Sequence, residues 1–97
     1  MCNDYERHIE WAAYEAALAD YRSAAAQLSV INGEAIPSLE ASFKAAEARY
    51  GAGQGQLELP LAIVRRYVET FIRSIEQQGR RARAAAELVY LTQDIQR

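Results

Sequence analysis

Apolar side chains recur in alternating steps of three and four residues along two long stretches of this sequence. The first stretch carries the series Tyr14, Leu18, Tyr21, Ala25 and Leu28. The second carries a longer series with the same step: Leu57, Leu61, Val64, Val68, Phe71, Ile75, Gln78, Ala82, Ala85, Val89 and Thr92. This spacing is that of the apolar seam of a coiled-coil helix. The pattern therefore predicts one helix over about residues 5–50 and another over about residues 58–93.

The seam of the first predicted helix slips ahead of Pro37. It resumes as the series Ile36, Leu39, Phe43, Ala46 and Tyr50, offset from the first series as in a coiled-coil stutter. Pro37 removes the backbone hydrogen bond to the carbonyl of Gly33 and disfavours a helical Ile36. Because helix-favouring residues resume at once, we expect a kink near Pro37 and no full break.

A glycine-rich segment separates the two predicted helices. Gly51, Gly53 and Gly55 stand at alternating positions, and glycine reaches the positive φ at which helices commonly end. Pro60 suits the first turn of a new helix, where no N–H is needed. We therefore predict a turn over residues 51–57 and an all-α fold: a long antiparallel two-helix coiled-coil hairpin.

The composition of the chain is that of long helices around a thin core. The 97 residues allow one domain, and alanine, which buries little area, supplies much of the 51% hydrophobic content. Two helices that each bury one narrow stripe are marginal without further partners. Apolar residues also lie outside the two seams or at the end of the first one, at Trp11, Leu28, Ile31, Ile72, Leu88 and Leu91. They fit either core contacts within the hairpin or, as we prefer, contacts with other helices that complete a bundle.

Charge is distributed unevenly between the two halves. Residues 1–50 carry eight acidic and four basic side chains, whereas residues 51–97 carry seven arginines and five acidic side chains. Folding the second half back on the first pairs an acidic arm with a basic one, which favours this packing although each exposed pair contributes little. The net charge of −2 favours neither nucleic acid nor an anionic membrane as a partner.

The sequence holds little that suggests catalysis or metal binding. Cys2 and His8 lack a third metal ligand, and the single cysteine excludes an intrachain disulfide. The glycines of the turn follow a helix and lack the lysine of a phosphate-binding loop, and the cluster Arg80-Arg81-Ala82-Arg83 is flanked by acidic residues. We expect no enzymatic activity, no catalytic residues, no cofactor and no metal.

No apolar run approaches the length of about 20 residues that a membrane-spanning helix needs, so we expect no membrane span. The polar, acidic start of the chain, Met1 to Arg7, does not resemble a signal peptide. A chain expressed as written is therefore expected in the cytoplasm.

The stretch around the turn resembles the outer-membrane efflux protein family, the TolC-like channels, including their heavy-metal efflux branch. The family pattern A-x-x-x-Y-x-x-G-x-x-x-L joins its last two long helices, and Ala46, Tyr50, Gly53 and Leu57 stand at those positions. The similarity covers roughly residues 16–93. On this basis residues 16–97 are interpreted as a partial TolC-like helical hairpin, and residues 1–15 as an N-terminal extension that continues into the first helix.

The resemblance implies a structural role in tripartite efflux. In the family, three protomers form a periplasmic coiled-coil tunnel continuous with an outer-membrane β-barrel, and the turn lies at the tip that meets the periplasmic adaptor of the pump. Residues expected at that contact are Tyr50, Gly53, Gln54, Gln56 and Leu57. The implied location is the periplasm and outer membrane, and the implied partners are helices of the same or other protomers, in a trimer, and the adaptor.

The chain also departs from that family. The segment Leu59-Pro60-Leu61-Ala62-Ile63 replaces the usual run after the turn, and the β-strands and first structural repeat are missing. We therefore expect a fragment that is not competent as a channel alone. The alternative hypothesis is a free-standing helical hairpin that self-associates or binds another coiled coil.

Residues 1–11, from Met1 to Trp11, are similar to the start of the SOS-response-associated peptidase family. That family acts on abasic DNA through an N-terminal cysteine that is exposed when Met1 is removed, and here the cysteine is Cys2. The later Asn, Glu and His motifs of the family are absent. A remnant DNA-repair enzyme therefore ranks behind the two helical hypotheses.

Overall fold

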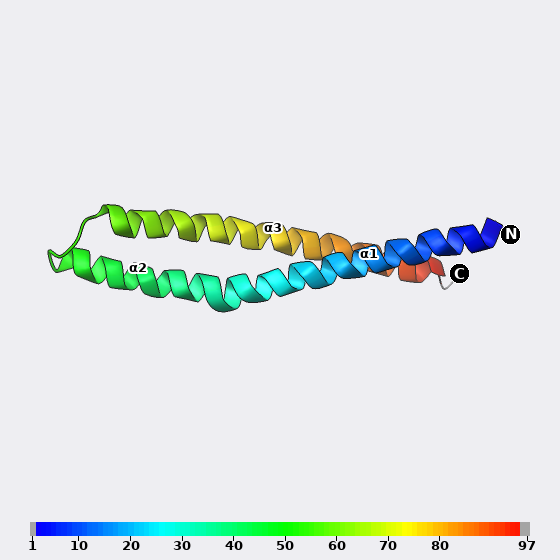
Figure 1. The fold of residues 1–97 in the computed structure, drawn as a ribbon, viewed down its shortest axis with the longest axis horizontal. Coiled ribbons are helices and arrows are strands. Elements are labelled where there is room, and N and C mark those ends of the chain that lie inside the picture. The colour runs from blue at the N-terminus through cyan, green and yellow to red at the C-terminus, as the bar shows by residue number, and fades with distance from the viewer. Residues whose placement is uncertain (1, 96–97) are drawn as a thin grey trace. The chain divides into compact units, whose positions relative to one another are not determined.

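The computed structural model describes residues 2–95, and all of its regular elements in that range are helical. They are α1 (Cys2–Val30), the π-helix η1 (Ile31–Ala35), α2 (Ile36–Gly51) and α3 (Glu58–Ile95) (Figure 1). The first three elements follow one another without a break, and α1 runs continuously past residue 15. The predicted all-α helical hairpin, with a turn between two long arms, is confirmed.

The hairpin consists of two compact units. One unit combines residues 1–26 with residues 77–97, and the other comprises residues 27–76. In each unit a segment of the first arm packs against a segment of α3, and the two segments run antiparallel because the chain reverses only at the turn. The second unit contains η1, α2, the turn and the first half of α3.

The irregularity expected near Pro37 takes the form of a π-helix. The N–H of Ile36 donates to the carbonyl of Ile31, five residues earlier, so η1 contains one residue more than an α-helical turn would. Pro37 follows directly and has no N–H with which to restore the α-helical bond to Gly33. The extra residue moves the buried face along by one position, which accounts for the slip in the sequence pattern.

Small side chains form the core of the unit that combines residues 1–26 and 77–97. Ala17, Ala24 and Ala84 are buried, together with Leu91 near the end of α3. Alanine at these positions lets two helices approach closely, but each alanine buries little apolar area. The predicted first seam is partly wrong here: Ala17 and Ala24 are buried, whereas Leu18, next to Ala17, is only half-buried.

The core of the unit formed by residues 27–76 is equally thin. Leu28, Ile31 and Ala46 are buried on the first arm, and Pro60 and Ser74 on α3. The predicted second seam of the first arm is confirmed over four positions that are buried or half-buried: Ile36, Leu39, Phe43 and Ala46. Its last member, Tyr50, is exposed.

Candidate helix-packing surface

The inner face of α3, which packs on the first arm, is a heptad series one residue away from the predicted seam. In residues 27–76 this face is buried or half-buried at Pro60, Ile63, Tyr67, Thr70 and Ser74. The spacing continues in the other unit with Gln77, Ala84, Leu88 and Leu91. The predicted seam from Leu57 to Thr92 is therefore wrong as the line of contact within the hairpin.

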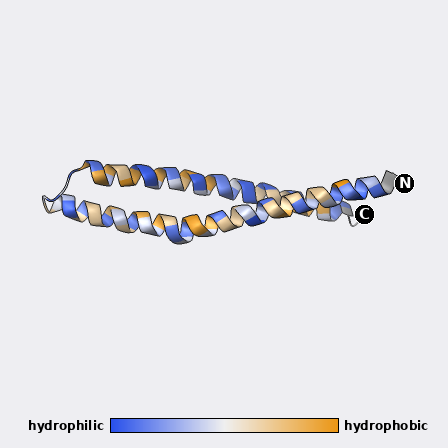
Figure 2. Ribbon diagram, in the orientation of Figure 1, coloured by the Kyte–Doolittle hydropathy of each residue, from blue (hydrophilic) through white to orange (hydrophobic). Residues whose placement is uncertain are grey.

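The predicted seam of α3 instead forms a second apolar face, turned by roughly 100° from the inner face. Within residues 57–75 its large members and the adjacent Ile72 retain 40–55% of their accessible surface: Leu57, Leu61, Val64, Val68, Phe71, Ile72 and Ile75. We call these seven residues the outer stripe, and Figure 2 shows the apolar bands that recur along α3. One residue corresponds to roughly 100° of rotation about a helix axis, so the two faces of α3 point in different directions.

A groove connects the outer stripe to the seam between the arms. Its volume is about 280 Å³, and its lining residues are Glu40, Phe43, Lys44, Ile63, Val64 and Tyr67. Val64 belongs to the outer stripe, whereas Ile63 and Tyr67 belong to the inner face. Apolar side chains therefore continue from the inner face into the outer stripe, with the charges of Glu40 and Lys44 contributed by the first arm.

The turn closes α2 with a Schellman motif. The N–H of Gln54 donates to the carbonyl of Arg49 at 2.8 Å, and the N–H of Gly53 donates to the carbonyl of Tyr50 at 3.0 Å. Gly53 adopts a φ of 78°, the left-handed conformation that this motif requires after a helix end. The glycine at position 53 is therefore explained by the backbone of the turn.

The residues predicted to contact an adaptor are all exposed and contiguous around the turn. Tyr50 keeps 46% and Leu57 47% of its accessible surface. Gly53, Gln54 and Gln56 are exposed as well, and the carbonyl of Gln56 accepts a hydrogen bond from Leu59 at 3.4 Å. The structure thus brings these five residues together at one end of the hairpin, where their side chains lie open to solvent.

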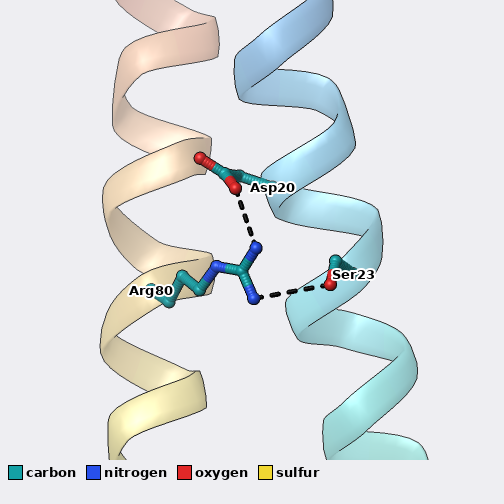
Figure 3. Close-up of polar contacts among 3 residues, drawn as sticks. All are labelled: Asp20, Ser23 and Arg80. Carbon is teal, nitrogen blue, oxygen red and sulfur yellow. Dashed lines mark hydrogen bonds and ion pairs between the residues drawn. The ribbon is translucent and has the colours of Figure 1, made fainter.

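Polar contacts join the arms within each unit. Arg80 of α3 reaches across to α1, where its Nη2 donates to Oδ1 of Asp20 at 2.8 Å and its Nη1 to Oγ of Ser23 at 3.4 Å (Figure 3). In the other unit, the hydroxyl of the buried Ser74 donates to Oδ1 of Asn32 at 3.2 Å. The Arg80–Asp20 pair is one contact between the basic and acidic arms that the sequence predicts.

One buried polar atom on the inner face lacks a partner. The side-chain oxygen Oε1 of Gln77 is buried and accepts no hydrogen bond within the described part of the chain. A buried acceptor without a donor destabilises the folded state, because it loses its bond to water without replacement. Gln77 is therefore a weak point of the contact between the arms.

Cys2 and His8 are the residues that the sequence offers as candidates for metal binding or catalysis. Among the described side chains, those of residues 4–94, no cluster of three or more His, Cys, Asp or Glu is arranged to hold a metal ion. His8 lies in a shallow pocket with Arg7, Glu10, Trp11 and Asp94. The side chain of Cys2 lies outside the described residues. Within residues 2–95, no helix combines the length and apolarity required to cross a membrane.

Comparison with known proteins returned no match: no protein-family model, no curated protein and no solved structure corresponds to this chain. The function is therefore argued from the two faces of α3 and from the turn.

The apolar residues outside the predicted seams fall into two groups. Leu28, Ile31 and Leu91 are buried within the hairpin and Leu88 is half-buried there, as expected for core contacts. Trp11 and Ile72 remain 58% and 50% exposed. Sequence reasoning missed the inner face of α3, because Thr70, Ser74 and Gln77 make it more polar than the outer stripe. Its regular heptad spacing, beginning at Pro60, is the signal that identifies it.

Proposed function

We propose that this chain is a non-enzymatic helix-packing module, and that its outer stripe contacts a helix outside the hairpin. The observation that carries the proposal is the exposure of all seven large apolar side chains of the stripe. All of them except Ile72, which widens the stripe, follow coiled-coil spacing from Leu57 to Ile75 over about five helical turns. A helix with two heptad faces is suited to contact two neighbours, and within residues 27–76 the first arm covers only one of these faces.

The energetics support this proposal. Full burial of a large apolar side chain contributes about 1.5–3 kcal/mol, so the half that remains exposed on each residue offers about 1 kcal/mol. The outer stripe therefore offers roughly 7 kcal/mol to a partner, and a partner stripe of equal size offers as much again. Together these terms are comparable to or larger than the association cost of about 4–15 kcal/mol.

Sedimentation equilibrium over a concentration series tests the module, with circular dichroism to follow helicity. The diagnostic variant is Val68→Lys, which places a charge at the centre of the outer stripe. The matched control is Ala62→Lys, which adds the same charge at an exposed position of α3 off the stripe. The proposal predicts association that Val68→Lys weakens at least tenfold and that Ala62→Lys leaves unchanged. A helical monomer at every concentration, equally stable in both variants, contradicts it.

A second candidate function is a segment of a TolC-like efflux tunnel. The observation that favours it is the exposed turn, because Tyr50 in the last turn of α2 is exposed together with Gln54, Gln56 and Leu57, which lie between α2 and α3. In this form of the proposal, the outer stripe packs on neighbouring helices of the tunnel wall and the turn meets the adaptor. Its location would then be the periplasm and outer membrane.

Binding to a purified adaptor hairpin from a tripartite pump tests this second candidate. Isothermal titration should show binding that the double variant Tyr50→Ala/Leu57→Ala abolishes. The control is Glu87→Ala, an exposed position in the other unit, far along α3 from the turn. Absence of binding by the unmodified hairpin, or equal loss in the control, contradicts the efflux assignment and leaves the packing module standing.

A further inference from the structure

We infer that the partner of the outer stripe is a second copy of this chain, packed antiparallel with α3 against α3 about a two-fold axis beside residue 66. The inference rests on the proposed packing module and names its occupant. Four independent features of residues 57–75 lead to it.

The outer stripe is self-complementary when it is reversed. Antiparallel pairing about residue 66 places Leu57 opposite Ile75 of the second copy, Leu61 opposite Phe71 and Val64 opposite Val68. Each of these six heptad members of the stripe then meets another apolar residue, and each contact occurs twice, as a two-fold interface requires. No member of the heptad series between Leu57 and Ile75 is left facing a polar position.

The sizes of the side chains follow the same symmetry. The two smallest members of the stripe, Val64 and Val68, flank the two-fold axis, and the larger Leu61 and Phe71 come next on either side. Packed helices cross at an angle and lie closest at one point. Small residues at that point and larger ones beyond it fill the widening space between two crossing helices.

The angle between the two faces of α3 favours a four-helix bundle. Because the outer stripe lies one residue from the inner face, its direction differs by roughly 100°, close to the right angle between the two neighbours of a helix in a four-helix bundle. Each chain supplies two helices, so two copies complete four. In a wider ring of helices, the two neighbours of each helix lie at a much more open angle.

The available area is sufficient for a dimer. Seven side chains that keep about half of their accessible surface offer roughly 600 Å² per copy, or about 1,200 Å² in total, the lower bound of stable interfaces. The groove beside Val64 adjoins this surface, so Phe43 can contribute further apolar area. A dimer through the outer stripe is therefore expected to form in the micromolar range of concentration, not the nanomolar.

Disulfide cross-linking tests the arrangement in a Cys2→Ser background. The variant Val64→Cys/Val68→Cys places thiols directly opposite each other in the antiparallel dimer. Either single variant leaves its two thiols about 6 Å apart along the helix axes, in addition to their lateral separation, which a disulfide does not span without movement. Ala62→Cys, off the stripe, measures random collision. Leu61→Cys/Phe71→Cys provides a second antiparallel pair if the first variant loses its helicity.

The inference predicts at least tenfold more covalent dimer from a double variant than from either single variant or from Ala62→Cys. Equal or greater cross-linking of Val64→Cys alone, or a trimer in sedimentation, overturns the antiparallel dimer while the packing module stands. If the double variants cross-link no more than Ala62→Cys and the chain sediments as a monomer, both the antiparallel dimer and the packing module are overturned.

Discussion

Ser74 donates a hydrogen bond to Asn32 over 3.2 Å, and this contact joins the middle of α3 to the π-helix of the first arm. Ser74 is 3% exposed, whereas Asn32 lies on the exposed side of η1. A polar contact at one position of the seam between two helices favours one register over its alternatives. We infer that this pair holds the π-helix opposite Ser74.

A double-mutant cycle on this pair should show coupling. We expect Ser74→Ala and Asn32→Ala each to destabilise the hairpin by about 1 kcal/mol, and the double variant to lose less than the sum. Urea unfolding at a fixed protein concentration measures the three differences in free energy. Thr70→Ala, one step earlier on the inner face, serves as the control. If the losses in the free energy of unfolding of the two single variants add up to that of the double variant, the two side chains do not stabilise each other.

The Arg80–Asp20 pair should contribute little. Both side chains are partly exposed, at 35% and 58%, so water and salt screen their attraction. We expect Asp20→Asn to cost about 0.5 kcal/mol in dilute buffer, and most of that effect to disappear near 1 M salt. Chemical unfolding in urea at two salt concentrations measures it, with the exposed Glu15→Gln as the control. A cost of several kcal/mol, independent of salt, would refute this account of the contact.

Replacing Gln77 by leucine should stabilise the hairpin. The variant removes a buried acceptor without a donor and adds apolar volume on the inner face, for a gain of about 1–2 kcal/mol. Gln27→Leu, at an exposed position, is the matched control and should change the free energy of unfolding by less than about 0.5 kcal/mol. Destabilisation by Gln77→Leu would mean that the side-chain amide is satisfied in solution.

Gly53 and Gly51 offer a matched pair at the turn. Gly53→Ala forces an L-residue into a φ of 78° and should cost about 1 kcal/mol, with Gly53→Asn costing less. Gly51→Ala lies in helical backbone with free space around the added Cβ, so it should stabilise the hairpin by about 0.5–1 kcal/mol. Thermal unfolding distinguishes the two. Equal effects would contradict the Schellman geometry of the turn.

The hairpin follows from local signals in the sequence. The glycines and Pro60 placed the turn, and the helix-favouring residues on both sides of it, which resume directly after Pro37, predicted arms close to those in the structure. The slip ahead of Pro37 was visible as a change in the apolar pattern. The physical form of the slip was not visible in the sequence. A shift of one residue in the apolar pattern can be accommodated by a kink or by a π-helix such as η1.

Apolar periodicity alone does not select the face of α3 that contacts the first arm over the outer stripe. Two heptad series lie one residue apart, and the outer stripe from Leu57 to Ile75 is the more apolar of the two. Periodicity therefore selected the stripe and passed over Thr70, Ser74 and Gln77. The inner face is defined by tertiary contacts, such as the bond from Ser74 to Asn32, that the pattern of one helix does not contain.

The dependence of thermal unfolding on protein concentration tests most directly the claim that α3 packs on a helix of another chain in addition to the first arm. The account predicts that the Tm of the unmodified chain rises by about 3–5 °C for each tenfold increase in concentration. Ala62→Lys should behave in the same way, whereas Val68→Lys should unfold at a lower Tm that does not change with concentration. A Tm that is independent of concentration in all three proteins, and equal in Val68→Lys and the unmodified chain, would contradict the account.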